Sequence, residues 1–539
     1  MRLGKLTLFS CAAILTLPML GAGQQPSPTT PTIKVYSRET IVDVLVTDAK
    51  GTPVRGLRQS DFTVEENGKP QAIHSFAEFD EDPAPPPEPA PELGPNEFTN
   101  NQPLPETGPV NILLLDTLNT QQPADVVHEQ EAVMDYLEKM RPGTQIAIFL
   151  LSTSGLHTLQ PFTCEPSLLR RAVQTHMFEF GTEIEKWTRD WYTVDAIDEI
   201  AAYVSRIKGR KNLLWFTPGM PIPLVRDGGY SWSDPTVNGG WTSPDLGVVY
   251  RLMDAYELLT TEQIAVYPVD PRGIGGLGMA TMKAEAVAED LGGVAYYNNN
   301  DLGSVVASAI DHGSHFYTLS YFPPQKKDDG HFHTIRVAVD LPGLRLVYRK
   351  GYNAELPQLH LPTTGPSLMK ASLEAKLPNA TQLLFDVQVE PGTRPVGPPA
   401  PPVQGSLAHK YRNAPLTRFG LLYTLEANQL AFADGPGGTH NGSLEFDIAA
   451  YNNHRKLITT LKQTTKLPLD ADQDPQYLDQ PFQFSQQLDL PPGSIYLRVG
   501  ILDRTSNKVG TLEIPLTVPR NAAARRGLVI DHIEKPSEN

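Results

Sequence analysis

The chain has 539 residues, an ordinary hydrophobic content of 40% and a formal net charge of -16 at pH 7. Because a single hydrophobic core stops growing at roughly 250–300 residues, we expect several domains. The acidic balance excludes nucleic acid as a general partner, since phosphate binding requires a basic surface.

Residues 1–23 have the parts of a secretory signal peptide: a basic start, an apolar run over residues 6–20 and small residues before a cleavage point. The apolar run contains a proline and is too short for a membrane span, so we expect none after the signal is removed. Cys164 is then the only cysteine left, which excludes an intramolecular disulfide. The sequence therefore predicts an exported protein, either periplasmic or extracellular.

Apolar and polar residues alternate in residues 34–80, which we interpret as an N-terminal β module. Strands are expected at residues 41–48, from residue 62 to the turn at Asn67-Gly68, and at residues 73–79. A module of this size is too small for a stable core of its own, so we expect it to pack against another domain. Residues 81–109 are acidic and rich in proline, which predicts an extended linker.

Strand and helix patterns alternate from residue 110, which predicts an α/β domain over residues 110–353. Strands are expected at 110–116, 145–151, 156–162, 212–217, 264–270 and 293–297. Helices are expected at 125–140, 166–178, 194–207, 247–261, 281–291 and 302–311. This order is typical of a doubly wound, mostly parallel sheet with helices on both faces. Antiparallel strands at 315–321, 333–339 and 344–348 are expected to close the domain.

Residues 367–519 alternate short strands with Pro and Gly turns and show no helical pattern, which predicts an immunoglobulin-like β-sandwich. Strands are expected at 382–389, 417–425, 442–451, 482–488, 494–503 and 510–518. Residues 520–539 form a polar tail that we expect to fray.

Several segments, taken in order, resemble the VWFA-related domain family described from Acidobacteria. They read VDVLVTDAKGTPVRGLRQSDFTVEENGKP from residue 42, LDTLNT from residue 115, VDPRG from residue 269 and YTLSYFPP from residue 317. The resemblance covers residues 34–353, and YLRVGILDR from residue 496 extends it to the sandwich. It implies that the α/β domain has a von Willebrand factor A-like fold.

In A domains, a divalent cation lies above the sheet. It is held by Asp-x-Ser-x-Ser after the first strand, a Thr from a middle loop and an Asp after the fourth strand. The resemblance implies that Asp116 is the first acid and Thr120 the last hydroxyl of that motif. Leu118 stands where the first hydroxyl is expected, and Thr217 stands where the second acid is expected. The sequence therefore predicts a degenerate metal site.

Two residues offer replacement oxygens for a hard cation such as Mg²⁺: the amide of Asn119 and the carboxylate of Asp270. Thr182 and Thr193 are candidates for the middle-loop hydroxyl. The competing interpretation is that Asp116 and Asn119 accept backbone N–H bonds and cap the following loop and helix. We favour capping and expect no cofactor, with Mg²⁺ as the ion if the site is functional.

A long loop over residues 220–246 follows the fourth strand, and loops of this length are usually functional or disordered. Tyr230, Trp232 and Trp241 lie in it and are candidate anchors for a protein ligand. They could equally pin the loop to its own domain. Trp215, in the strand before the loop, is either a further anchor under the first interpretation or a core residue under the second.

The sequence contains no Gly-x-Ser-x-Gly elbow, His-Glu-x-x-His pair or P-loop, so we do not expect an enzyme. We predict an exported, non-catalytic protein that binds another, unidentified protein. One alternative makes that binding dependent on Mg²⁺ through Asp116 and Thr120. Another is a hydrolase or an enzyme accessory subunit. The sequence leaves the oligomeric state open.

Overall fold

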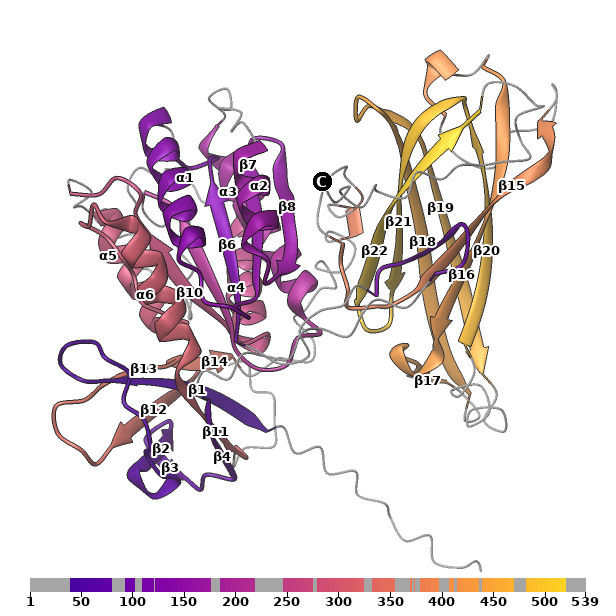
Figure 1. The fold of residues 1–539 in the computed structure, drawn as a ribbon. Helices are drawn as coiled ribbons and strands as arrows, with labels where there is room; N and C mark the ends of the chain where they lie inside the picture. The colour runs from indigo at the N-terminus through magenta and orange to yellow at the C-terminus, as the bar shows by residue number, and fades with distance from the viewer. Residues whose placement is uncertain are drawn as a thin grey trace, which may run out of the picture. The chain divides into compact units, whose positions relative to one another are not determined.

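The computed structural model describes residues 39–79, 93–101, 109–120, 122–175, 185–218, 246–274, 279–323, 332–353, 369–370, 373, 379–396, 407–411, 414–435, 439–469 and 481–519. The expected signal peptide, the aromatic loop at 220–245 and the tail at 520–539 lie outside these residues. The described elements form a β module, an α/β domain and a β-sandwich (Figure 1). Among the described helices, none is long and apolar enough to cross a membrane.

The sheet of the α/β domain has the strand order β10-β9-β6-β7-β8. Its strands are β6 (Val110–Asp116), β7 (Ile146–Ser152), β8 (Gly155–Thr163), β9 (Lys211–Phe216) and β10 (Ile264–Val269). Strands β10, β9, β6 and β7 run parallel, and β8 is antiparallel at one edge. The four parallel strands are buried along their whole length. The predicted doubly wound, mostly parallel sheet is therefore confirmed.

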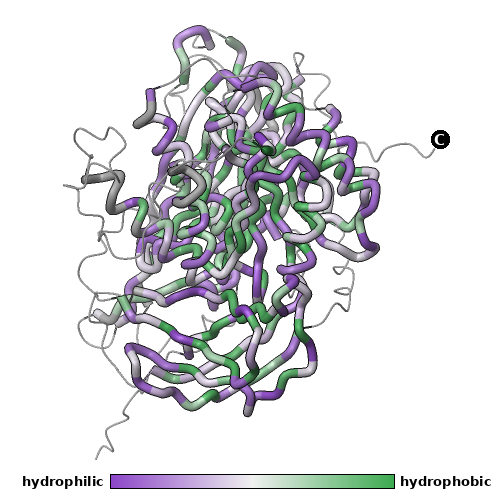
Figure 2. Tube along the Cα trace, turned by 90° about the vertical axis from the view of Figure 1, so that its left-hand side faces the viewer, coloured by the Kyte–Doolittle hydropathy of each residue, from purple (hydrophilic) through white to green (hydrophobic). Residues whose placement is uncertain are grey.

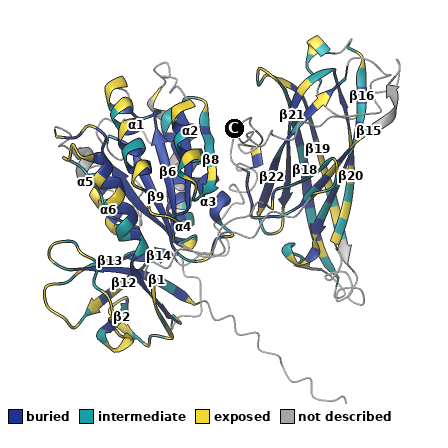
Figure 3. Cartoon of the chain, viewed as in Figure 1, coloured by how far each residue is buried: buried dark blue, intermediate teal, exposed yellow. Residues whose placement is uncertain are grey.

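Helices cover both faces of this sheet (Figure 1), and the sheet strands are buried between them (Figure 3). One face carries α1 (Pro123–Glu138), α2 (Pro166–Thr175) and α6 (Leu302–Ser314). The other carries α3 (Lys186–Val204), α4 (Leu246–Thr261) and α5 (Met279–Asp290). Successive side chains of β6 point to opposite faces, so Leu113 and Leu115 join one core while Ile112 and Leu114 join the other.

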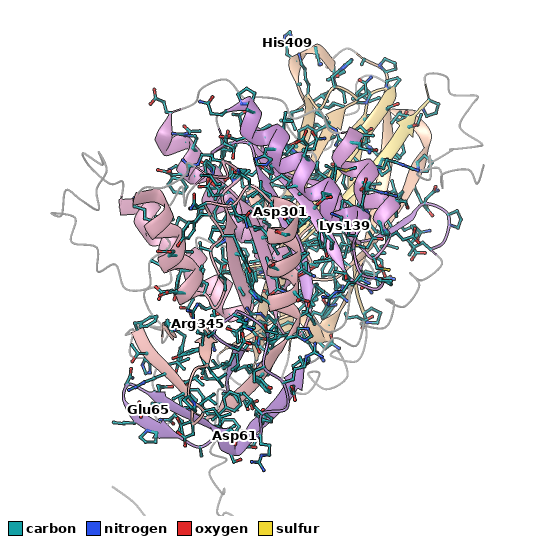
Figure 4. All side chains as sticks on the ribbon, turned by 60° about the vertical axis from the view of Figure 1, so that its left-hand side comes forward. Asp61, Glu65, Lys139, Asp301, Arg345 and His409 are labelled. Carbon is teal, nitrogen blue, oxygen red and sulfur yellow. The ribbon has the colours of Figure 1, made fainter. Side chains whose placement is uncertain are left out.

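Local sequence fixes where these helices begin. The Asp301 side chain accepts a hydrogen bond from the backbone N–H of Ser304 at 3.1 Å and so caps the first turn of α6, where Figure 4 labels it. Pro123 occupies the first turn of α1, where a missing N–H costs nothing. Near the end of α1, Lys139 pairs with Asp135 at 2.9 Å.

The strands after α6 do not close the α/β domain as expected. Strands β11 (Phe316–Tyr321), β12 (Phe332–Val339), β13 (Arg345–Val347) and β14 (Gly351–Asn353) instead complete the N-terminal β module. Its earlier strands are β1 (Thr40–Thr47), β2 (Phe62–Glu66), β3 (Lys69–Gln71) and β4 (Ser75–Phe79), with a short 3-10 turn η1 (Gln59–Asp61).

The β module consists of two antiparallel sheets, ordered β13-β1-β11-β4 and β14-β12-β2-β3. Their shared core joins Val42 and Val64 from the early strands to Leu319 and Val337 from the late ones. The α/β domain is therefore inserted between β4 and β11. This differs from the expected boundary at 110–353, because half of the module's apolar strands come after the insertion.

The C-terminal part is a sandwich of two antiparallel sheets around one core. One sheet holds β5 (Glu97–Thr99), β15 (Asp386–Val396), β16 (Leu416–Glu426) and β20 (Pro481–Leu490). The other holds β17 (Ala433–Asp434), β18 (His440–Asn452), β19 (Leu457–Leu469), β21 (Gly493–Asp503) and β22 (Val509–Val518). Short 3-10 turns are η2 (His409–Tyr411) and η3 (Ala427–Gln429).

Strand β5 lies within residues 81–109, which the sequence predicts as a linker. Phe98 pairs with Val387 of β15 and packs against the sandwich core. Asn100 is fully buried, and its side-chain amide donates to the carbonyl oxygens of Ala380 and Leu383 at 3.1 and 2.8 Å. Residues 97–99 of the predicted linker therefore form an edge strand of the sandwich.

Residues 293–297 do not form the expected strand and make one isolated bridge, between Tyr296 and Val269. A Cβ on Gly293 would lie 1.9 Å from the carbonyl oxygen of Val266, so the chain there runs tightly against β10.

Strand β19 of the sandwich is not among the strands expected from the sequence, and it is rich in Thr and Lys. In Figure 2 hydrophobic and hydrophilic stretches alternate along the tube.

Candidate functional site

Asp116 ends β6 at the carboxyl edge of the sheet and is fully buried. Its Oδ1 accepts hydrogen bonds from the backbone N and the Nδ2 of Asn119, at 3.0 and 3.1 Å. Its Oδ2 accepts from the same Nδ2 and from Nε1 of Trp215, both at 2.9 Å. Burial raises the pKa of Asp116 to about 6, although these hydrogen bonds act to lower it.

The β6–α1 loop brings Asn119 and Thr120 next to Asp116. The Nδ2 of Asn119 also lies 3.3 Å from the Oγ1 of Thr193, one of the two candidates for the middle-loop hydroxyl. The backbone N of Thr120 donates to the carbonyl oxygen of Asp116 at 3.1 Å. The Oγ1 of Thr120 is buried and has no hydrogen-bond partner within the described structure. Thr182 lies outside the described residues.

Asp270 does not join this group through a hydrogen bond, because Arg272 engages its carboxylate. The guanidinium donates from Nε to Oδ1 at 2.9 Å and from Nη2 to Oδ2 at 2.6 Å. The backbone N of Arg272 adds a third bond to Oδ1 at 3.0 Å. A carboxylate held in this bidentate manner is poorly placed to coordinate a cation.

The ligand set implied by the resemblance does not fit the residues present. Leu118 is buried and apolar, and Thr217 stands after β9 where an acid is required. Among the residues that the structure describes, no group of three or more His, Cys, Asp or Glu side chains is arranged to hold a metal ion. Among the described residues, the ligand set that the resemblance implies is therefore incomplete.

Glu129 is a further polar residue near this site, and no motif in the sequence singles it out. It lies on α1, is fully buried, and neither of its carboxylate oxygens has a hydrogen-bond partner in the described part of the chain. Burial raises the pKa of Glu129 well above its ordinary value, and the negative charges of Asp116 and Asp125 raise it further. The helical spacing of the sequence indicates that Glu129 is buried, because it shares the buried face of α1 with Val126 and Val133.

Trp215 is fully buried, which agrees with the second of the two interpretations, and its polar N–H has a specific role that the sequence did not indicate. Buried indole groups need an acceptor, and here the acceptor is Asp116. Trp215 pairs with Leu114 across the neighbouring strands β9 and β6. The pairing places the indole close to the end of β6.

The surface near this end of the sheet is formed by the start of α1 and the turn after β10. Nδ1 of His128 lies 2.9 Å from the carbonyl oxygen of Pro271, which joins the two segments. Val127 is 49% exposed and Ile274 is 70% exposed. We call these two side chains the apolar pair. Tyr230, Trp232 and Trp241 lie outside the described residues, so their predicted role is not tested.

One contact between a nucleophile and an imidazole lies in the β7–β8 turn. Oγ of Ser154 lies 2.7 Å from Nε2 of His157 and 2.9 Å from Oγ of Ser152. Ser154 and His157 are three residues apart, so the turn itself brings them together. This geometry is common in polar turns and does not by itself define a catalytic site.

No protein-family model matches the chain, and no curated protein matches it in sequence. Among solved structures, proximal thread matrix protein 1 from the mussel byssus is 14% identical with a TM-score of 0.26, over 39% of this chain and 49% of that protein. The match thus spans about half of the mussel protein.

A von Willebrand factor type A protein from Catenulispora acidiphila is 11% identical with a TM-score of 0.25, over 50% of this chain and 73% of that one. An aerotolerance-related membrane protein from Bacteroides fragilis is 12% identical with a TM-score of 0.24, over 38% and 99%. Matches at this level say nothing about what the chain binds.

Proposed function

We propose that this is an exported, non-catalytic protein that binds another protein through the surface at the carboxyl edge of its α/β sheet. The observation that carries this proposal is the apolar pair, Val127 and Ile274, exposed on the two segments that the His128–Pro271 hydrogen bond joins. We propose that these two side chains belong to one exposed apolar surface, and such surfaces favour protein contact. This edge is also where open α/β sheets hold their ligands.

Charged groups near the apolar pair fit the same proposal. Asp125, on the first turn of α1, lies close enough to Arg272 that the guanidinium charge lowers the Asp125 pKa, although burial raises it overall. An apolar centre with charged residues at its rim is the usual composition of a protein interface. Tyr230, Trp232 and Trp241 are proposed to extend this surface.

We further propose that the chain is a member of the VWFA-related family described from Acidobacteria. Support comes from the segments quoted above, of which the one from residue 42 is the longest. Export is supported by the pattern of residues 1–23, a basic start followed by an apolar run and small residues.

The test measures saturable binding of the fluorescently labelled protein to an envelope fraction of its native cells, before and after protease treatment of that fraction. Binding should disappear after proteolysis and in Val127→Asp and Ile274→Asp. Leu341→Asp and Leu457→Asp are matched controls, because these leucines are 48% and 45% exposed in other parts of the chain. Equal binding by all four variants would contradict the proposed surface, and binding that survives proteolysis would exclude a protein ligand.

Mg²⁺-dependent binding through Asp116 and Thr120 is the second candidate, and the partnerless Oγ1 of Thr120 is the observation that favours it. Against it, both oxygens of Asp116 already accept hydrogen bonds from Asn119 and Trp215. The same binding assay in EDTA and in Mg²⁺, below the melting temperature of the metal-free protein, separates the two. Binding that requires the ion would favour the second candidate.

Hydrolysis is a third candidate, favoured by the contact between Ser154 and His157. A serine activated by a histidine reacts with fluorophosphonates. We expect no labelling of the wild type above the level of Ser154→Ala. Labelling that is lost in the variant would make the protein a hydrolase.

A further inference from the structure

A small pocket lies at the amino edge of the α/β sheet, where β10 begins. It is lined by Ile264 and Ala265 of β10, by Arg210 directly before β9, and by Ile41 of β1 and Arg349 before β14. Its volume is about 20 Å³, and one water molecule needs roughly 10–15 Å³. The pocket therefore has space for one small guest.

Arg210 brings a buried positive charge to this pocket and is only 3% exposed. Its Nε donates to Oδ1 of Asn212 at 3.1 Å. Its Nη2 donates to the hydroxyl oxygen of Tyr267 at 2.8 Å and to the carbonyl oxygen of Gly292 at 2.6 Å. All three acceptors are neutral, so these bonds hold the guanidinium in place without neutralising its charge. A buried charge is costly unless an opposite charge offsets it.

Arg349 is the second cation of the pocket, and neutral acceptors hold it as well. Its Nη1 and Nη2 donate to the carbonyl oxygens of Thr260 and Ile41, at 3.2 and 2.6 Å. Its Nε is buried and has no hydrogen-bond partner in the described part of the chain. Burial lowers the pKa of Arg349 more than the nearby negative groups raise it. The pocket thus contains a guanidinium that retains an unused donor.

The negative charges nearby do not balance these two cations. Asp43 is the acid among the lining residues, and its oxygens accept hydrogen bonds from Oγ1 of Thr318 at 2.6 Å and Nε2 of Gln263 at 3.2 Å. Lys211 and Glu262, next to the pocket along the chain, carry opposite charges that act on each other. At pH 8, above the pKa of about 7 to which burial raises Glu262, these two offset each other. One positive charge is then left over.

We propose that this pocket binds one small monovalent anion of the halide class, which accepts the Nε–H of Arg349 and offsets the charge of the two guanidiniums. An oxyanion such as phosphate brings several oxygens that each need a donor, whereas a halide ion is satisfied by few. Apolar walls that include Leu259 and Leu291 leave little else to donate. The site is independent of the protein-binding surface proposed above, which lies at the opposite, carboxyl edge of the sheet.

Two measurements on the full chain at pH 8 test this site with chloride as the probe. The first follows the chloride line width by nuclear magnetic resonance, because exchange with a protein-bound site broadens the line. We expect excess broadening that saturates with chloride and is removed by bromide. The second compares melting temperature in sodium chloride and sodium gluconate at equal ionic strength, which holds screening constant. Chloride should raise the melting temperature, since a ligand that binds only the folded state stabilises it.

Two variants locate the chloride. Arg349→Lys keeps the positive charge and removes the Nε–H, so it should weaken chloride binding by on the order of 10–100-fold, the range for one hydrogen bond to a charged group. Gln263→Glu keeps the side-chain shape and adds a carboxylate to the lining, so it should also weaken binding. The matched controls are Arg336→Lys, whose parent side chain is 77% exposed, and Gln59→Glu, whose parent residue is exposed. Both controls should keep the wild-type affinity.

Three results would overturn the proposal. The first is wild-type broadening that does not saturate together with equal melting in chloride and gluconate, because a water molecule would then account for the pocket. The second is unchanged chloride affinity in folded Arg349→Lys and Gln263→Glu, which would place the ion elsewhere. The third is displacement of chloride by phosphate at a lower concentration than by bromide, which would exclude the halide class.

Discussion

Trp215→Phe removes the N–H that the indole donates to Asp116 and keeps an aromatic ring in the core. Burial raises the pKa of Asp116 from its ordinary 3.8 to about 6, and the indole acts to lower it, so the bond favours the ionised carboxylate. Because the pKa of the Asp116 carboxyl is higher in the folded state than in the unfolded state, the folded state binds the proton of this carboxyl more tightly. The stability that Asp116 contributes at low pH is lost as the pH rises through 6, by about 3 kcal/mol.

The expected cost of Trp215→Phe has two parts. A hydrogen bond to a charged group contributes about 1.5–3 kcal/mol, and one between neutral groups about 0.5–1.5 kcal/mol. The smaller ring adds about 1–3 kcal/mol at any pH, since Trp→Ala in a core costs about 3–5 kcal/mol. We therefore expect a loss of about 2.5–6 kcal/mol at pH 8, where Asp116 is ionised, and about 1 kcal/mol less at pH 5, where it is protonated.

Urea unfolding in EDTA at pH 5 and pH 8, followed by circular dichroism, measures this difference. Phe149→Leu is the control, because Phe149 is fully buried in strand β7 of the same sheet and its ring carries no hydrogen-bonding group. The control variant should lose the same free energy of unfolding at both pH values. An equal loss at both pH values for Trp215→Phe would refute the assigned role of the indole.

Two further predictions concern the β module and the sheet. Tyr321→Phe removes the hydroxyl that donates to the buried carboxylate of Glu66 at 2.7 Å. Urea unfolding should show that the free energy of unfolding falls by about 1.5–3 kcal/mol. A much smaller decrease would mean that this hydrogen bond contributes little to stability. Gly293→Ala places a Cβ 1.9 Å from the carbonyl oxygen of Val266, so scanning fluorimetry should show a melting temperature far below that of the wild type. Gly420→Ala is the control, because its Cβ would lie 4.0 Å from the nearest carbonyl oxygen, and its melting temperature should stay close to that of the wild type. Similar melting of the two glycine variants would contradict the tight crossing at β10.

The sheet of the α/β domain was predictable because its parallel strands are buried on both faces and read as uninterrupted apolar runs. The capping interpretation of Asp116 agrees with the structure, since its carboxylate accepts the backbone N–H of Asn119. For Asn119 the interpretation differs from the structure, because its side chain donates to Asp116 instead of accepting. Sequence alone does not say which way an amide faces.

Glu129 and β5 were beyond the sequence analysis for different reasons. The buried position of Glu129 could be read from the helical stripe, but its proximity to Asp116 depends on where α1 lies above the sheet. Strand β5 has three residues in a proline-rich stretch, too few for a periodic pattern, and its partner β15 begins at Asp386. The insertion between β4 and β11 likewise could not be predicted, because the alternating pattern of a strand does not indicate which other strand it pairs with.

The insertion has a consequence for how the chain is made. Phe79 of β4 is synthesised about 240 residues before its partner Phe316, so at about 5–20 residues per second the strand waits on the order of 10–50 s. Phe98 of β5 waits longer, for Val387. Throughout this time the earliest strands have open edges that can pair with other chains. The yield of folded protein should therefore depend on how crowded the growing chains are, as well as on the stability of the finished fold.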